Sequence, residues 1–128
     1  MRIGQFFKGL YSLIQRNPEQ AYIVEVTTVF ILVDHPWHGK TVINWEDLIN
    51  IVLINTDKGP WFTDLWISLE SKEVSVKIPQ GANGYDLLFE YITNLDNVNF
   101  DNIIESMTCT DNSRFLIWSA ICQNKRHY

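Results

Sequence analysis

Residues 73–78 read EVSVKI, and this short stretch decides the expected fold class. Val74, Val76 and Ile78 alternate with charged and polar side chains, which is typical of a strand with one face on a core and one face in water. That pattern belongs to antiparallel sheets, because the strands of parallel sheets are covered on both faces. We therefore expect an antiparallel sheet at the centre of the protein.

Four further segments upstream are rich in β-branched and aromatic residues, which favour strands. They are residues 22–33, 41–44, 49–55 and 65–69. The connections between them are too short for the crossover that parallel neighbours require, so hairpins are predicted. The sequence thus predicts an antiparallel meander of about five strands.

Helical spacing of apolar residues appears on both sides of this strand region. Residues 3–16 predict an amphipathic helix that Pro18 ends. Residues 85–95, capped by Asn83, predict a helix that buries Leu88, Phe89 and Ile92, and a short helix is expected near residues 101–107. The apolar run 115–122 fits either a strand or a helix. The expected fold is a single α+β domain over residues 1–128, with the N-terminal helix and the C-terminal helices packed on the sheet.

Composition narrows the classes of partner. The 128 residues carry ten Lys and Arg against fifteen Asp and Glu, a net charge of -5. This charge disfavours nucleic acid, whereas basic surfaces on other proteins remain suitable partners. No apolar run approaches the roughly 20 residues of a membrane span, so we expect a cytoplasmic protein with membrane binding unlikely. Cys109 and Cys122 are expected to be reduced.

Two histidines lie in one turn, beside a carboxylate. His35 follows Asp34 directly and His38 comes three residues later, in a segment that Gly39 ends. Zinc requires three or four ligands, so no metal is predicted here, and no cofactor motif is present elsewhere. Cys109 with either histidine lacks the glycine elbow and oxyanion loop of a nucleophilic site. We therefore expect a protein that is not an enzyme, with a small enzyme or ligand binder that uses this turn as the alternative.

A second turn, residues 57–66, is unusually aromatic. Its rings either fold back on the core or face a partner. If Ile67 and Leu69 face the core, alternation places Trp66 on the outer face of the sheet. The candidate partner-binding residues, for a protein partner or a second copy of the chain, are Trp61, Phe62, Trp66, Asp57 and Asp64.

Four short motifs resemble those of a family of small uncharacterised bacterial proteins. They are GPW-x2-D-x-W at residues 59–66, IPQGA at 78–82, FDN at 100–102 and TDN-x-RFL-x-W at 110–118. The resemblance covers about residues 40 to 118. It implies a bacterial origin and a shared fold, but no activity. A strand meander followed by a helix is also similar to pleckstrin-homology-type domains, a likeness of fold that implies no function.

Together these observations favour a non-enzymatic protein-interaction domain in the bacterial cytoplasm. One version is an immunity-type protein that neutralises a toxin, which small size and acidity suggest. A membrane-surface module that uses residues 3–16 is a further alternative.

Overall fold

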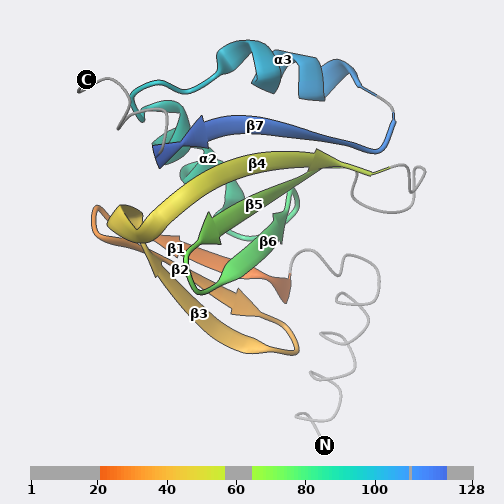
Figure 1. The fold of residues 1–128 in the computed structure, drawn as a ribbon. Helices are drawn as coiled ribbons and strands as arrows, with labels where there is room; N and C mark the ends of the chain where they lie inside the picture. Colours follow the sequence, from red (N-terminus) through yellow and green to blue (C-terminus); the bar gives the residue numbers. More distant parts are fainter. Residues whose placement is uncertain (1–20, 57–64, 110, 121–128) are drawn as a thin grey trace, which may run out of the picture.

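The computed structural model describes residues 21–56, 65–109 and 111–120. These residues form seven strands in two sheets, together with two α-helices that follow the first six strands (Figure 1). The strands are β1 (Ile23–Val26), β2 (Phe30–His35), β3 (Gly39–Asn44), β4 (Leu48–Asn55), β5 (Leu65–Ser71), β6 (Ser75–Pro79) and β7 (Ser113–Ser119). The helices are α2 (Tyr85–Thr93) and α3 (Phe100–Thr108).

The architecture differs from the expected one. Every strand pair is antiparallel, but the strands form a three-stranded sheet in the order β1-β2-β3 and a four-stranded sheet in the order β6-β5-β4-β7. The α+β prediction of one meander of about five strands with an N-terminal helix and C-terminal helices is therefore wrong. The predicted helix at residues 3–16 lies outside the described residues.

The count of strands was wrong partly because residues 22–33 contain a tight turn that no Gly or Pro marks. The hydroxyl oxygen of Thr27 accepts hydrogen bonds from the backbone N–H groups of Val29 and Phe30, at 3.1 and 2.9 Å. A threonine side chain can hold a turn in this way. The indole N–H of Trp45 donates to the Thr27 carbonyl at 2.7 Å and fixes the turn from the other side.

The two sheets are linked on both sides. On one side a short 3-10 helix, Trp45–Asp47, leads from β3 into β4. On the other side the segment after β6 binds β1, because the Val24 N–H donates to the Asn83 carbonyl at 2.7 Å and the Asn83 N–H donates to the Tyr22 carbonyl at 3.0 Å. The two sheets therefore face each other across an enclosed core.

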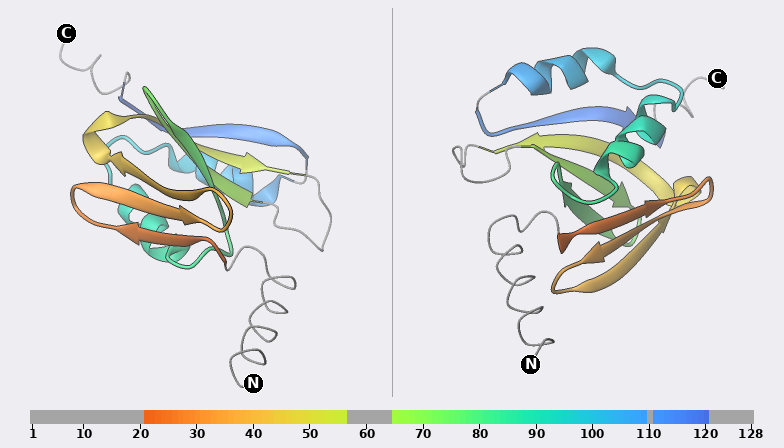
Figure 2. Two further views of the ribbon diagram at one scale, coloured as in Figure 1. Left: turned by 90° about the horizontal axis from the view of Figure 1, so that it is seen from below. Right: turned by 180° about the vertical axis from the view of Figure 1, so that it is seen from behind.

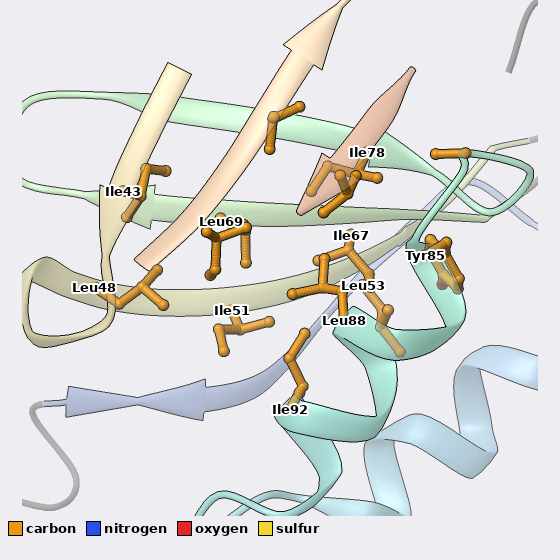
Figure 3. Close-up of a cluster of buried hydrophobic side chains, with 14 of the residues drawn as sticks. Ile43, Leu48, Ile51, Leu53, Ile67, Leu69, Ile78, Tyr85, Leu88 and Ile92 are labelled. Carbon is orange, nitrogen blue, oxygen red and sulfur yellow. The ribbon is translucent and has the colours of Figure 1, made fainter. Parts of the chain in front are cut away.

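The core lies between the two sheets and α2, as Figure 3 shows. Aliphatic side chains dominate it, which suits strands of β-branched residues. Its fully buried members include Ile31, Ile51, Leu53, Ile67, Leu69, Ile78, Leu88, Ile92 and Ile117. Burial of such side chains contributes roughly 1.5–3 kcal/mol each.

Helix α2 begins where the chain passes very close to β1. Its N-cap is Gly84, with φ 93°, so Asn83, which the sequence predicted as the cap, lies one residue before the cap position. A Cβ at Gly84 would collide with the carbonyl of Val24, so the position requires glycine for space as well as for its dihedral angle. Leu88 and Ile92 are buried as predicted, whereas Phe89 is only half-buried and stacks on Tyr85.

Most of the apolar run 115–122 lies in a strand, β7 (Ser113–Ser119), and residues 121 and 122 lie outside the described residues. β7 pairs with β4, and α3 lies alongside β7 (Figures 1 and 2). Polar groups join the helix to the strand: the Asn102 side chain donates to the Leu116 carbonyl at 2.8 Å, and the Asn99 N–H donates to the Ile117 carbonyl at 2.8 Å. These bonds cover the outer edge of β7, which would otherwise be open to pairing with another chain.

Candidate functional site

Of the five partner-binding residues predicted from the sequence, the structure describes only Trp66. Asp57, Trp61, Phe62 and Asp64 lie outside the described residues. Trp66 lies in β5, where it is half-buried and packs against the core. Its ring meets that of Tyr22 edge-on, with the ring centroids 6.2 Å apart. Part of its apolar surface is therefore covered by the residue that precedes β1.

The histidine turn is held by His35 itself. Its Nδ1 atom accepts hydrogen bonds from the backbone N–H groups of Trp37 and His38, at 3.1 and 3.2 Å. The other ring nitrogen, Nε2, lies 3.3 Å from the hydroxyl oxygen of Tyr22. Asp34, which the sequence grouped with the two histidines, is not among the residues that line the pocket described below. Trp37 is 70% exposed, and its ring lies beside that of His35, with the ring centroids 5.8 Å apart.

These residues meet in a pocket between the β2–β3 hairpin and the β5–β6 hairpin. Its volume is about 390 Å³. The lining residues are Tyr22, His35, His38, Thr41, Trp66, Ser75, Val76 and Lys77. Thus the structure brings together His35, His38 and Trp66, which the sequence had assigned to two separate candidate sites. We call it the Tyr22–His35 pocket.

Ring contacts give this pocket its shape. The ring of Tyr22 meets that of His35 edge-on, with the ring centroids 4.8 Å apart. The ring centroids of His35 and His38 are 4.3 Å apart. Tyr22 therefore contacts an aromatic group on each side, because Trp66 flanks it as well. Edge-on contacts of this kind are favourable, since the positive ring edge meets the negative ring face.

Burial shifts the pKa values of two polar side chains of the Tyr22–His35 pocket, His35 and Tyr22. Burial lowers the pKa of His35, and the neighbouring His38 lowers it further. Burial raises the pKa of the Tyr22 hydroxyl. Both side chains are therefore uncharged at neutral pH. Lys77 is the one Lys or Arg side chain among the described residues of this lining, and no Asp or Glu of the described residues belongs to it.

The helices present a different kind of surface. Phe100, Ile104 and Met107 follow helical spacing on α3 and are 52%, 61% and 63% exposed. Asp101 and Glu105 lie directly beside this stripe and are also exposed. We call these five residues the α3 stripe.

The segment of the chain that contains the α3 stripe carries charge of one sign. Residues 85–112 contain six acidic residues and none of the ten Lys and Arg residues of the chain. The acidic residues are Asp86, Glu90, Asp96, Asp101, Glu105 and Asp111, and all six are exposed. This one segment thus has a charge of -6, whereas the whole chain has -5.

Two classes of site receive no support. Within residues 21–56, 65–109 and 111–120, no group of three or more His, Cys, Asp or Glu side chains is arranged to hold a metal ion. Among the helices of these residues, none is long and apolar enough to cross a membrane. Cys109 is a free thiol, and Cys122 lies outside the described residues.

Comparisons with protein-family models, with curated proteins and with solved structures found no match. The resemblances to a bacterial family and to pleckstrin-homology-type domains therefore stay predictions.

The sequence patterns predicted neither the full lining of the Tyr22–His35 pocket nor the α3 stripe. The register of β5 and β6 pairs Ser68 with Lys77, which places Trp66 and Lys77 on one face, and alternation in the sequence was a usable signal for this. No local signal brought Tyr22 and His35 to the same place. The run of acidic residues from 85 to 112 was visible in the sequence, but the net charge of the whole chain concealed it.

Proposed function

We propose that this protein is a non-enzymatic interaction domain that binds a basic, amphipathic segment of another protein through the α3 stripe. The observation that carries the proposal is the combination of exposed apolar side chains on α3 with a segment, residues 85–112, whose charged residues are all acidic. Large apolar side chains on a surface cost free energy in water unless a partner covers them. Three of them at helical spacing match the way amphipathic partners are usually bound.

The charge decides between kinds of partner. Six acidic residues without a single basic one attract a positively charged segment and repel a nucleic acid or an anionic membrane. Two copies of the same acidic surface also repel each other, which disfavours self-association through α3. A basic partner is therefore favoured over a second copy of this chain.

The mode of binding follows from the side chains. Phe and Met are enriched at the centres of interfaces, and the flexible Met side chain adapts to different partners. The acidic residues around them belong to the polar rim, where they guide association more than they add affinity. An immunity-type role, in which an acidic protein blocks a basic surface of a toxin, is one form of this function.

The proposal can be tested with two fluorescent peptides that share an amphipathic helical pattern of Leu, one with Lys and one with Glu as the polar residue. Fluorescence anisotropy should show binding of the Lys peptide only, and the affinity should fall as salt is added. The double substitution Ile104→Ser and Met107→Ser should weaken binding by about tenfold or more, since central apolar contacts carry most of the free energy of an interface.

The matched control is Leu87→Ser on α2, a side chain that is 48% exposed but lies outside the α3 stripe. Both variants should melt close to the wild type, because the altered side chains are largely exposed. If the Lys peptide binds the α3 variant as tightly as it binds the Leu87 variant, the proposed interaction surface is wrong.

A further inference from the structure

The Tyr22–His35 pocket contains a short chain of hydrogen bonds whose direction is fixed by chemistry. A backbone N–H can only donate, so the Nδ1 atom of His35 accepts from Trp37 and from His38 and carries no proton. The neutral ring then carries its proton on Nε2. That N–H must donate to the Tyr22 oxygen, which lies 3.3 Å away.

The consequence falls on the Tyr22 hydroxyl. Its oxygen accepts from His35, so its own hydrogen is left to donate to something else. Because burial raises the pKa of this hydroxyl, it keeps that hydrogen throughout the neutral range. Tyr22 therefore contributes to the lining of the pocket an oriented donor whose natural partner is a hydrogen-bond acceptor.

The remaining lining residues specify more of the ligand. Rings of Tyr22, Trp66 and the two histidines supply flat apolar surface, against which a planar ring packs well. Lys77 supplies a positive charge, and among the described residues no carboxylate lines the pocket beside it. A volume of about 390 Å³ lies within the usual range for sites of small molecules.

We propose that the Tyr22–His35 pocket binds a small planar aromatic carboxylate, with its ring against Trp66 and its carboxylate on the Tyr22 hydroxyl and the Lys77 ammonium. A carboxylate can accept a hydrogen bond from each of these two groups at once, and its negative charge complements the Lys77 ammonium. This site is independent of the α3 stripe, since the two share no residue.

The test uses isothermal titration calorimetry on the full chain with three probes. Indole-3-carboxylate has the ring and the charge, its methyl ester has the ring alone, and cyclohexanecarboxylate has the charge alone. We expect the first probe to bind at least about tenfold more tightly than each of the others, because an acceptor charge and a stacked ring each contribute to the free energy.

Substitutions locate the site. Tyr22→Phe removes the donor and keeps the ring, and Lys77→Gln removes the charge, so each should weaken binding of indole-3-carboxylate by about tenfold. Lys72→Gln is the matched control, because Lys72 is an exposed lysine of the β5–β6 turn outside the pocket lining. Circular dichroism confirms that each variant is folded before its affinity is compared.

The outcomes separate cleanly. Equal binding of the acid and its ester, or equal binding to wild type and Tyr22→Phe, would overturn the assignment. Binding unchanged in Lys77→Gln would overturn the role of the cation, and no binding of any probe to the folded wild type would overturn the site. The Ile104→Ser and Met107→Ser variant should bind indole-3-carboxylate normally, so failure of the α3 proposal and failure of this one are distinguishable.

Discussion

Two tyrosines of the core differ in one respect that stability measurements can resolve. Tyr85 is 5% exposed and Tyr22 is 9% exposed, so both rings are buried. The Tyr85 hydroxyl has no hydrogen-bond partner among the described residues, whereas the Tyr22 hydroxyl lies 3.3 Å from His35. Burial, together with the nearby Asp86, raises the pKa of Tyr85, so its hydroxyl is neutral as well as unpaired.

The substitution Tyr85→Phe should therefore increase the free energy of unfolding. An unpaired buried hydroxyl costs about 1–3 kcal/mol, because it loses its hydrogen bonds to water and gains none. Phe retains the ring and its stacking on Phe89, at a centroid distance of 6.2 Å. The small void left by the oxygen offsets part of the gain, so we expect a net stabilisation of about 1 kcal/mol.

Tyr22→Phe is the matched comparison, for which we expect a change in stability of the opposite sign. It removes a partnered hydroxyl and leaves His35 without its acceptor, so it should destabilise the protein by about 0.5–1.5 kcal/mol. The hydrogen bond is long, at 3.3 Å, which places the expected value at the lower end of that range.

Urea unfolding followed by tryptophan fluorescence measures both changes, with m-values that should match the wild type. A stabilisation of 1 kcal/mol corresponds to a rise in Tm of roughly 3–5 °C for a chain of this size. If Tyr85→Phe lowers the stability as Tyr22→Phe does, the Tyr85 hydroxyl has a partner and the reasoning about its burial fails.

Three further predictions concern the backbone, a buried amide and pH. Gly84→Ala should lower the free energy of unfolding by more than about 2 kcal/mol, because the new Cβ clashes with β1 and alanine disfavours a positive φ. Gly39→Ala should lower it by only about 1–2 kcal/mol, because Gly39 has φ 81° but open space around it. Thermal melting of the two variants measures the difference. Asn55→Leu should lower the free energy of unfolding in urea by about 1–3 kcal/mol, because the Asn55 amide donates to the carbonyls of Ser106 and Cys109 at 2.6 and 3.2 Å. A change near zero would contradict this. The pKa of His35 is lower in the folded state, so the unfolded chain binds more protons and stability should fall as the pH drops below about 6.5. A His35→Gln variant should lose less stability between about pH 7.5 and 5. An identical loss in the variant and the wild type would contradict the role of His35.

Local patterns in the sequence located most strands and both described helices. Alternation identified residues 74–78, and observed β6 spans Ser75–Pro79. Helical spacing identified α2 and α3 to within a few residues of their observed ends. These signals work because side-chain direction repeats with a fixed period in each element.

Features that depend on distant contacts were not predictable in the same way. The turn at Thr27 relies on a side-chain oxygen and on Trp45, which lies 18 residues away in the sequence. Such a turn has no Gly or Pro to mark it, so a hairpin resembles one long strand. The division into two sheets likewise depends on pairing across the fold, which alternation alone does not specify.

The pocket shows the same limit at the level of function. His35 and Trp66 belong to different sheets, and only the packing of the two hairpins brings them together. The sequence placed Asp34 with the histidines because it is their neighbour in the chain. In a strand the side chains of neighbours point to opposite faces, and this is the physical reason that Asp34 does not share the site with His35.

The way α3 is attached to the sheet explains why its apolar stripe matters. Its buried side chains are only Ile103 and Ser106, and polar groups supply much of the remaining contact. The Asn55 amide donates to the Ser106 carbonyl at 2.6 Å, and Asn102 donates to the edge of β7. A helix held in this way does not need further large apolar side chains in order to dock. Phe100, Ile104 and Met107 therefore add an exposed surface that costs free energy without stabilising the fold, and coverage by a partner is the role that best accounts for them.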